Sequence, residues 1–139
     1  MSVRAQIESW LAMADLPQSL PRKLDAEGFW SVSMGPLTLT LGIPTHLERA
    51  ERPQFFLYMP LLSLEGFTSS VRERFCRRLL EIQLRGGLPV GMAFGMDSEG
   101  DLLVLAGRYP VRVMEAALFS ETLRLVLSSG RELREQLEA

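Results

Sequence analysis

The sequence contains very few of the residues that carry covalent or metal chemistry in proteins. It has one cysteine, Cys76, and one histidine, His46. A single cysteine cannot form a disulfide within the chain, and its position on a semi-apolar helical face is typical of a buried thiol. His46 has no serine, cysteine or metal-ligand partner at a motif spacing, which disfavours a role as a general base. The sequence therefore argues against a thiol nucleophile, a hydrolytic triad and a zinc site.

Two short patterns imitate ligand-binding motifs but lack the residues that those motifs require. The glycines within 86–95 are not followed by Gly-Lys-Ser/Thr and do not have the Gly-x-Gly-x-x-Gly spacing of a phosphate-binding loop. Asp97, Glu99 and Asp101 resemble a sparse calcium loop, but the glutamate at the far ligand position is missing. We therefore predict no catalytic residue, no bound metal and no cofactor, and we expect that the protein is not an enzyme.

An excess of positive charge and long apolar runs are also absent. The chain of 139 residues has 17 acidic and 15 basic side chains and a net charge of −2, which provides no general attraction for nucleic acid or anionic lipid. Glu8 and Asp15 interrupt the apolar start, so no signal peptide is predicted, and no stretch approaches the length of a membrane span. We expect a cytoplasmic protein with a single domain over residues 1–139.

Apolar periodicity in the first half of the chain predicts one helix and three strands. The helix is expected over 2–15, with Ser2 as its N-cap. After a loop, alternating apolar and polar residues predict strands over 29–34, 37–41 and 54–59. The third strand is apolar on both faces and therefore needs a second cover, which can be a helix, another subunit or a ligand protein. His46 lies in the charged loop over 44–53 that precedes it.

A second helix is predicted to begin at Thr68 or Ser69 and to end before Gly86, which supplies the usual glycine after a helix C-terminus. Its apolar residues form two adjacent stripes, and so wide an apolar surface indicates burial on more than one side. One stripe contains Val71, Phe75, Leu79 and Ile82, and the other contains Cys76, Leu80 and Leu84.

A hairpin over 90–108 is predicted next, with a polar turn that ends at Gly100, the residue that adopts positive φ at least cost. The last helix is expected over 111–137 and contains Gly130. Glycine inside a helix costs about 1 kcal/mol relative to alanine, so Gly130 predicts a kink or a close approach to another segment.

The resulting order of elements is α-β-β-β-α-β-β-α. Adjacent strands joined by short turns indicate a mainly antiparallel sheet. We therefore predict an α+β fold, a two-layer sandwich in which helices pack on one face of a twisted, mainly antiparallel sheet.

Three stretches carry a resemblance to a known family. They are Leu79-Leu80-Glu81-Ile82-Gln83-Leu84, the turn from Phe94 through Asp97-Ser98-Glu99-Gly100-Asp101-Leu102, and Tyr109-Pro110-Val111. With the order of elements, they resemble the class I chaperones of bacterial type III secretion, the Tir-chaperone-like (CesT-like) family. The resemblance implies a small homodimer without catalytic activity that binds the N-terminal segment of a secreted virulence effector in extended form, keeps it export-competent and delivers it to the export ATPase.

The resemblance also implies two sets of site residues. The dimer is expected to form through the second helix and the strand after it, which corresponds to Val71, Phe75, Leu79, Ile82, Met92 and Phe94. The first helix and the first three strands are expected to offer the effector grooves, which corresponds to Trp30, Val32, Leu39, Leu41, Phe56 and Tyr58.

Other interpretations of the same residues remain open at this point. Large apolar side chains are usually found in a core, so the aromatic residues of the strands can instead be ordinary core residues. The arginines of the second helix are expected to form a solvated face paired with Glu73 and Glu81 rather than a phosphate site. The chain can also be an interaction subunit of a heterodimeric chaperone or another assembly, or a small-molecule-binding α+β domain.

Overall fold

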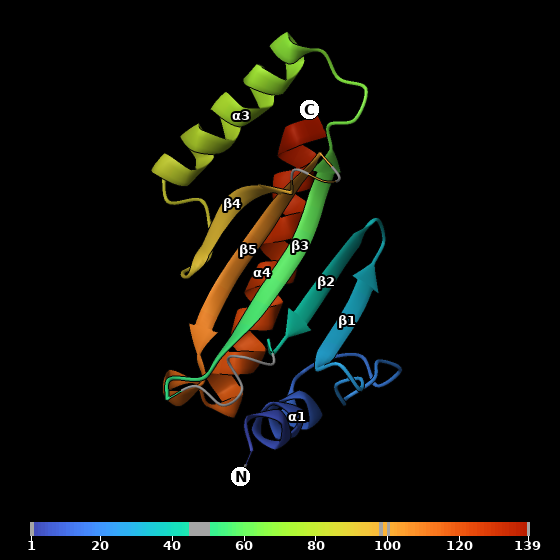
Figure 1. The fold of residues 1–139 in the computed structure, drawn as a ribbon, viewed down its shortest axis with the longest axis vertical. Coiled ribbons are helices and arrows are strands. Elements are labelled where there is room, and N and C mark those ends of the chain that lie inside the picture. The colour runs from blue at the N-terminus through green and yellow to red at the C-terminus, as the bar shows by residue number, and fades with distance from the viewer. Residues whose placement is uncertain (1, 45–50, 98, 100, 139) are drawn as a thin grey trace.

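The computed structural model describes residues 2–44, 51–97, 99 and 101–138. The helices and strands follow the predicted order (Figure 1). Their bounds are α1 Val3–Met13, β1 Phe29–Met34, β2 Leu37–Gly42, β3 Gln54–Ser63, α3 Ser69–Leu84, β4 Met92–Asp97, β5 Leu102–Pro110, a 3-10 turn η1 Val111–Val113 and α4 Ala116–Glu138. The predicted loop with His46 falls mostly on 45–50, outside the described residues.

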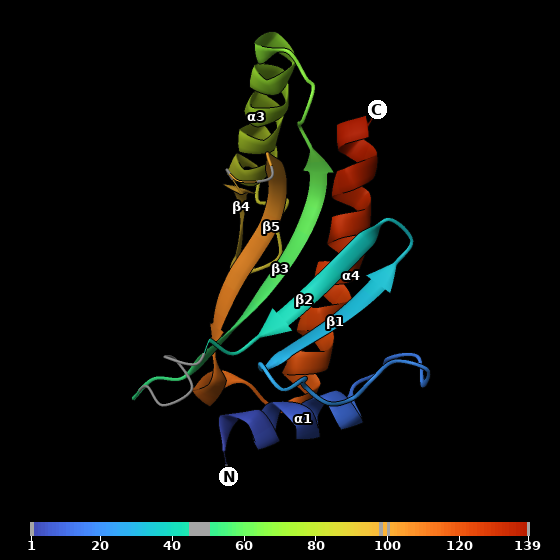
Figure 2. The same ribbon diagram turned by 45° about the vertical axis from the view of Figure 1, so that its right-hand side comes forward.

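The strands form one antiparallel sheet of five strands in the order β1-β2-β3-β5-β4. The long helix α4 runs along one face of the sheet, and α1 lies near the N-terminal end of α4 (Figures 1 and 2). The helix α3 lies beyond the β4 edge, beside the C-terminal end of α4. The predicted α+β fold is confirmed, and of the described helices none lies over the opposite face of β1, β2 and β3.

The core lies between the sheet and α4 because the strands alternate as predicted. Phe55, Leu57 and Met59 of β3 are buried, and they pack on the same side as the apolar residues of β2. On α4, Phe119 is fully buried, with its ring centroid 5.4 Å from that of Trp10 and 5.6 Å from that of Phe55. Alternation along the strands thus places one apolar row against the helices and leaves the other row outside.

The predicted N-cap of α1 and both predicted ends of α3 are confirmed, while α1 ends at Met13, two residues before the predicted end. The Ser2 hydroxyl accepts a hydrogen bond from the Ala5 amide, and the Thr68 hydroxyl accepts one from the Val71 amide. At the end of α3, the Gly86 amide donates to the Gln83 carbonyl and the Gly87 amide to the Ile82 carbonyl, both at 3.1 Å. Gly86 has a φ of +74°, so the helix closes with a Schellman motif that requires glycine at this position.

The last helix begins later than predicted. Val111 is buried and its amide donates to the Pro53 carbonyl at 3.0 Å, which holds this part of the chain at the sheet. Met114 is extended, with φ −93° and ψ 146°, and α4 starts only at Ala116. Residues 111–115 carry the chain from the end of β5 to the layer of helices. The expectation for Gly100 lies outside the described residues, and Asp101 beside it has a φ of +49°.

The glycine inside α4 lies where the helix approaches the sheet closely. Of the two explanations predicted for Gly130, a kink or a close approach, the structure supports the second. A Cβ atom added to Gly130 would lie 2.4 Å from the sulfur of Met59, which is fully buried on β3. The absence of a side chain at position 130 therefore allows α4 to sit close to β3.

Replacing Gly130 with alanine is expected to lower the free energy of unfolding by about 1 kcal/mol. Overpacking a tight core costs about 1–3 kcal/mol, which exceeds the gain of about 1 kcal/mol in helix propensity. Urea denaturation of both proteins measures the difference. The double variant with Met59→Ala should remove most of the penalty of the alanine, and a stabilised single variant would contradict the close approach.

Candidate binding surfaces

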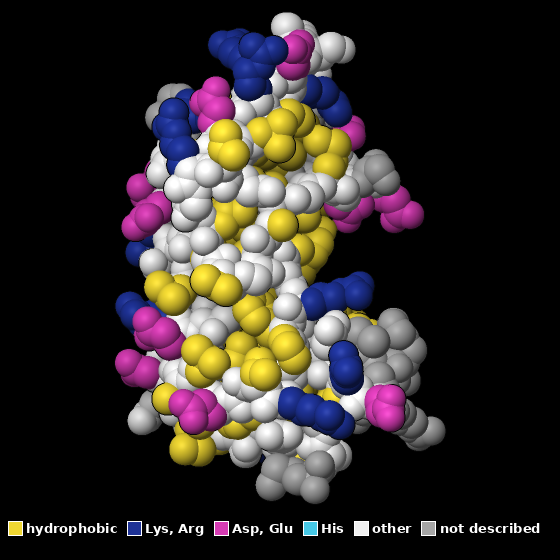
Figure 3. Space-filling model, turned by 90° about the vertical axis from the view of Figure 1, so that its left-hand side faces the viewer, with side chains coloured by type: hydrophobic (Ala, Val, Ile, Leu, Met, Phe, Trp, Pro, Cys, Tyr) yellow, Lys and Arg dark blue, Asp and Glu magenta, His cyan; other side chains and the backbone are white. Residues whose placement is uncertain are grey.

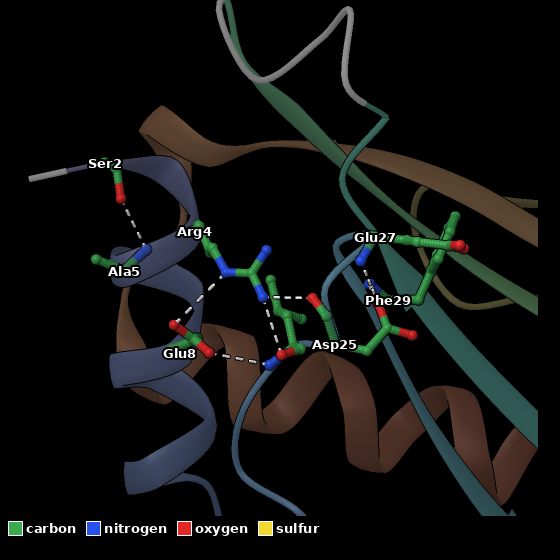
Figure 4. A network of polar contacts seen from close by, with 8 residues as sticks. Ser2, Arg4, Ala5, Glu8, Asp25, Glu27 and Phe29 are labelled. Carbon is green, nitrogen blue, oxygen red and sulfur yellow. Dashed lines mark hydrogen bonds and ion pairs between the residues drawn. The ribbon is translucent and has the colours of Figure 1, made fainter.

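A network of polar contacts ties α1 to the loop that leads into β1 (Figure 4). Arg4 donates to the carbonyls of Leu24 and Asp25, and the Glu8 carboxylate accepts from the Leu24 amide at 3.0 Å. The Asp25 carboxylate accepts from the Phe29 amide at 2.9 Å. These contacts fix the start of β1 relative to α1.

A second set of contacts holds the same loop against the end of α1. Arg22 donates to the carbonyls of Leu11, Ala14 and Leu16 at 2.7, 2.9 and 2.7 Å. The guanidinium group thereby joins the carbonyls of Leu11 and Ala14, at the end of α1, to the carbonyl of Leu16 in the loop that follows. The loop consequently forms a fixed wall beside β1.

The first candidate surface is the edge of the sheet at β1. This strand pairs with β2 on one side only, so its other side presents backbone groups that another strand can pair with. A hollow of about 430 Å³ lies beside this edge, between the loop after α1 and the middle of α4. Its apolar lining consists of Leu16, Pro17, Leu20, Val32, Met34 and Leu127.

The second candidate surface is the open face of the sheet. Phe56 and Tyr58 lie half-buried on it, and Phe29 contacts Phe56 with ring centroids 6.0 Å apart. A hollow of about 360 Å³ is lined by residues that include Phe56, Tyr58, Ala106 and Arg108. The second cover that the apolar strand β3 was predicted to need is therefore not supplied by any described helix.

The Tyr58 hydroxyl donates to the Asp97 carboxylate at 3.2 Å across this face. Burial raises the pKa of Tyr58, and the hydrogen bond to the Asp97 carboxylate raises it further. Tyr58 is therefore neutral at physiological pH, and its ring presents an apolar surface with one fixed polar end.

The third candidate surface lies on α3 and β4. Leu80, Leu84, Val90 and Met96 have exposed fractions of 67%, 89%, 93% and 48%. Figure 3 looks onto the side of the molecule that carries α3 and β4, and apolar side chains gather along it. Apolar side chains so exposed, on two elements that contact each other and on the loop between them, are typical of an interface with another protein chain.

An ion pair connects α3 to the hairpin of β4 and β5. Arg72 donates to the Asp101 carboxylate at 3.2 Å, and this hydrogen bond lowers the pKa of Asp101. Since the folded pKa lies below the unfolded one, the stabilisation is present above the unfolded value near 4 and is lost as the pH falls toward the folded value.

Replacing Arg72 with glutamine is expected to return the pKa of Asp101 toward its ordinary value. NMR titration of the carboxyl carbon measures the pKa in both proteins, with Asp25 as the internal comparison. An unchanged Asp101 titration would show that the ion pair does not form in solution.

The residues predicted to form the dimer occupy two kinds of position. Leu79 and Met92 are buried within the chain, and the other four are half-buried. Those four are Val71, Phe75, Ile82 and Phe94. The sequence assignment did not include the more exposed Leu80 and Leu84, although the second apolar stripe of the predicted helix was the signal for them.

The residues predicted to bind an effector also divide into two groups. Trp30, Val32, Leu39 and Leu41 are buried between the sheet and the helices, with no more than 3% of each exposed. Phe56 and Tyr58 lie on the open face and are accessible in part. Because the core uses the first group, we carry forward Phe56 and Tyr58 as surface residues, together with Val32, which also lines the hollow beside β1.

The described part of the chain lacks two other features. It contains no group of three or more histidine, cysteine, aspartate or glutamate side chains placed to hold a metal ion. No helix among the described residues has the length and apolar character needed to cross a membrane.

The model of the Tir chaperone protein (CesT) family matches residues 18–134. The chain belongs to the Tir chaperone protein (CesT) family. The resemblance to the class I chaperones of type III secretion is thereby confirmed. No curated protein gives a significant match to the chain.

Solved structures of similar fold include complexes of chaperones. The chain in the ExsC-ExsE complex has a TM-score of 0.69 at 17% identity, with 99% of this chain and 97% of that chain covered. The HopA1-SchA chaperone-effector complex gives 0.63 at 16% identity, with 94% and 91% covered. The type III secretion chaperone SycH of Yersinia pestis, in complex with a stable fragment of YscM2, gives 0.56 at 14% identity, with 94% and 98% covered. At these identities the likeness concerns the fold.

Proposed function

We propose that this CesT-family protein is a cytoplasmic type III secretion chaperone that acts without catalysis. In this proposal it forms a homodimer, binds the N-terminal segment of a secreted effector in extended form and keeps that segment export-competent. The observation that carries the proposal is the amount of apolar and unpaired surface that the chain leaves open. The β1 edge, the open sheet face and the α3–β4 surface all require a partner to be covered.

The β1 edge suits an extended polypeptide. A strand that pairs with β1 would gain backbone hydrogen bonds, which do not depend on its sequence. Side chains alternate along such a strand, so one row would point toward the hollow lined by Leu20, Val32 and Leu127. The effector would therefore be recognised by an apolar residue seated in this hollow.

The open face offers a second contact for the same effector. Phe56 and Tyr58 present aromatic area, and Arg108 stands beside them with an exposed side chain. A disordered segment pays its ordering entropy when it binds, so it needs a large contact area. An effector that passes from the β1 edge across the open face would cover both surfaces and meet this requirement.

The α3–β4 surface is left for the homodimer. Its exposed leucines lie on rigid secondary structure, which suits a permanent interface. Two bound copies would form one particle, and delivery of its effector to the export ATPase is the last step of the proposed function.

Affinity capture of the tagged protein, followed by native mass spectrometry, tests the proposal. We expect a particle with two copies of this chain and one copy of a larger secreted protein, and the contact should map to the N-terminal region of that protein. A single copy bound to a different small protein would instead support a heterodimeric chaperone. A free chain that carries a small-molecule adduct would contradict the chaperone function.

A further inference from the structure

A groove between α3 and the C-terminal end of α4 lies outside the three surfaces described above, although Val71, Phe75 and Ile82, which the sequence assigned to the dimer, line it. It has a volume of about 610 Å³. Its apolar lining comes from Val71, Phe75, Ile82 and Leu137, and four arginine side chains and one glutamate, Glu81, stand around it. This groove lies apart from both the β1 edge and the open face, which are lined by different residues.

The positive charge around the groove is largely unmatched. Residues 69–85 carry five arginines and two glutamates, a net charge of +3 in a chain whose net charge is −2. Arg77 pairs with Glu73 at 2.8 Å, as the sequence predicted. By contrast, the guanidinium groups of Arg74, Arg78 and Arg85 make no ion pair or hydrogen bond within the described part of the chain.

The periodicity of α3 separates this charge from the exposed leucines. At 3.6 residues per turn, Arg74, Arg78 and Arg85 lie within about 40° of one another around the helix, and Leu80 and Leu84 lie about 80–160° away from them. A dimer that forms through the leucine side therefore leaves the groove accessible. A second copy of this chain is a poor occupant of the groove, because the same positive side of α3 would approach itself.

We propose that this groove docks an acidic amphipathic segment of another polypeptide. Apolar residues of that segment would pack on Phe75 and Ile82, and its carboxylates would meet the arginines. The stripe from Arg74 to Arg85 is about 16 Å long along the helix, which matches about three turns of a bound helix. A nucleic-acid backbone would leave the apolar lining uncovered, so the groove favours a polypeptide.

Selection from a displayed library of 16-residue amphipathic helical peptides tests this inference. We expect the recovered peptides to be rich in aspartate and glutamate beside an apolar stripe. Fluorescence anisotropy with one recovered peptide should show at least about tenfold weaker binding to Arg78→Glu, because a matched charge becomes a repelling one. Lys23→Glu changes the net charge equally at an exposed site elsewhere and should bind the peptide like the parent protein.

Three outcomes would overturn the inference. They are a selection without acidic enrichment, equal losses for Arg78→Glu and Lys23→Glu, and tighter binding of a single-stranded oligonucleotide than of the peptide at the same salt concentration. Effector capture and dimer mass, measured on Arg78→Glu, separate this surface from the proposed function. Both should be unchanged, and loss of effector capture would place the groove within the effector site instead.

Discussion

Replacing Leu84 with glutamate is expected to convert the homodimer into a monomer. Leu84 has 89% of its surface exposed within one chain, so the substitution removes little packing from the monomer. In the proposed dimer it is buried, and symmetry introduces two carboxylates into the interface. A buried charge without a partner costs several kcal/mol, which exceeds the contribution of most single interface contacts. Sedimentation velocity at several protein concentrations measures the change in mass.

Met13→Glu is the matched control for this experiment. Met13 is also apolar and exposed, at 72%, but it lies on α1 rather than on α3 or β4. It should leave the dimer intact, and the circular dichroism of both variants should match that of the parent. A dimeric Leu84→Glu together with a monomeric Met13→Glu would move the interface to α1.

On α3, the sequence predicts the two helix ends and both apolar stripes, but it does not predict which stripe is buried. The caps at Thr68 and Gly86 have local causes, and the sequence located both ends of the helix. The two apolar stripes were equally visible, but which one meets the core depends on how the helix is rotated against α4 and β4. Burial of Leu79 and exposure of Leu80 follow from that tertiary arrangement and not from local pattern.

In the strands, too, the sequence pattern does not predict which residues are buried and which can meet an effector. Alternation identifies two faces within each strand, but it does not say which face of one strand continues onto the next. Only the register, which pairs Leu41 with Leu57 and Gly42 with Phe56, separates the buried face from the open one. The predicted set combined Leu41 from the first face with Phe56 from the second.

The end of β3 was missed for a related reason. The apolar pattern predicted that this strand ends at Met59, directly before Pro60, which cannot donate to the sheet. The strand continues to Ser63 because the register against β5 shifts between Pro60 and Leu62. Such a bulge accommodates the proline, and it depends on the partner strand.

Replacing Phe56 with glutamate is expected to leave the dimer intact and to weaken effector binding by about 100-fold. Phe56 is half-buried on the open face, away from α3, so a carboxylate there does not reach the proposed dimer interface. Loss of an aromatic anchor costs about 2–4 kcal/mol at an interface, and the new charge must also lose water when the effector covers it. Calorimetric titration with the captured effector segment measures the loss.

Thr38→Glu separates the effect of the lost anchor from the effect of added charge. Thr38 lies exposed on the same face, beside Ser33, where polar side chains replace the aromatic ones. Its substitution should change the affinity by less than about tenfold, because no apolar contact is removed. Equal losses for the two variants would show that the open face repels charge without anchoring the effector. Full affinity of Phe56→Glu would leave the β1 edge and its hollow as the whole effector site.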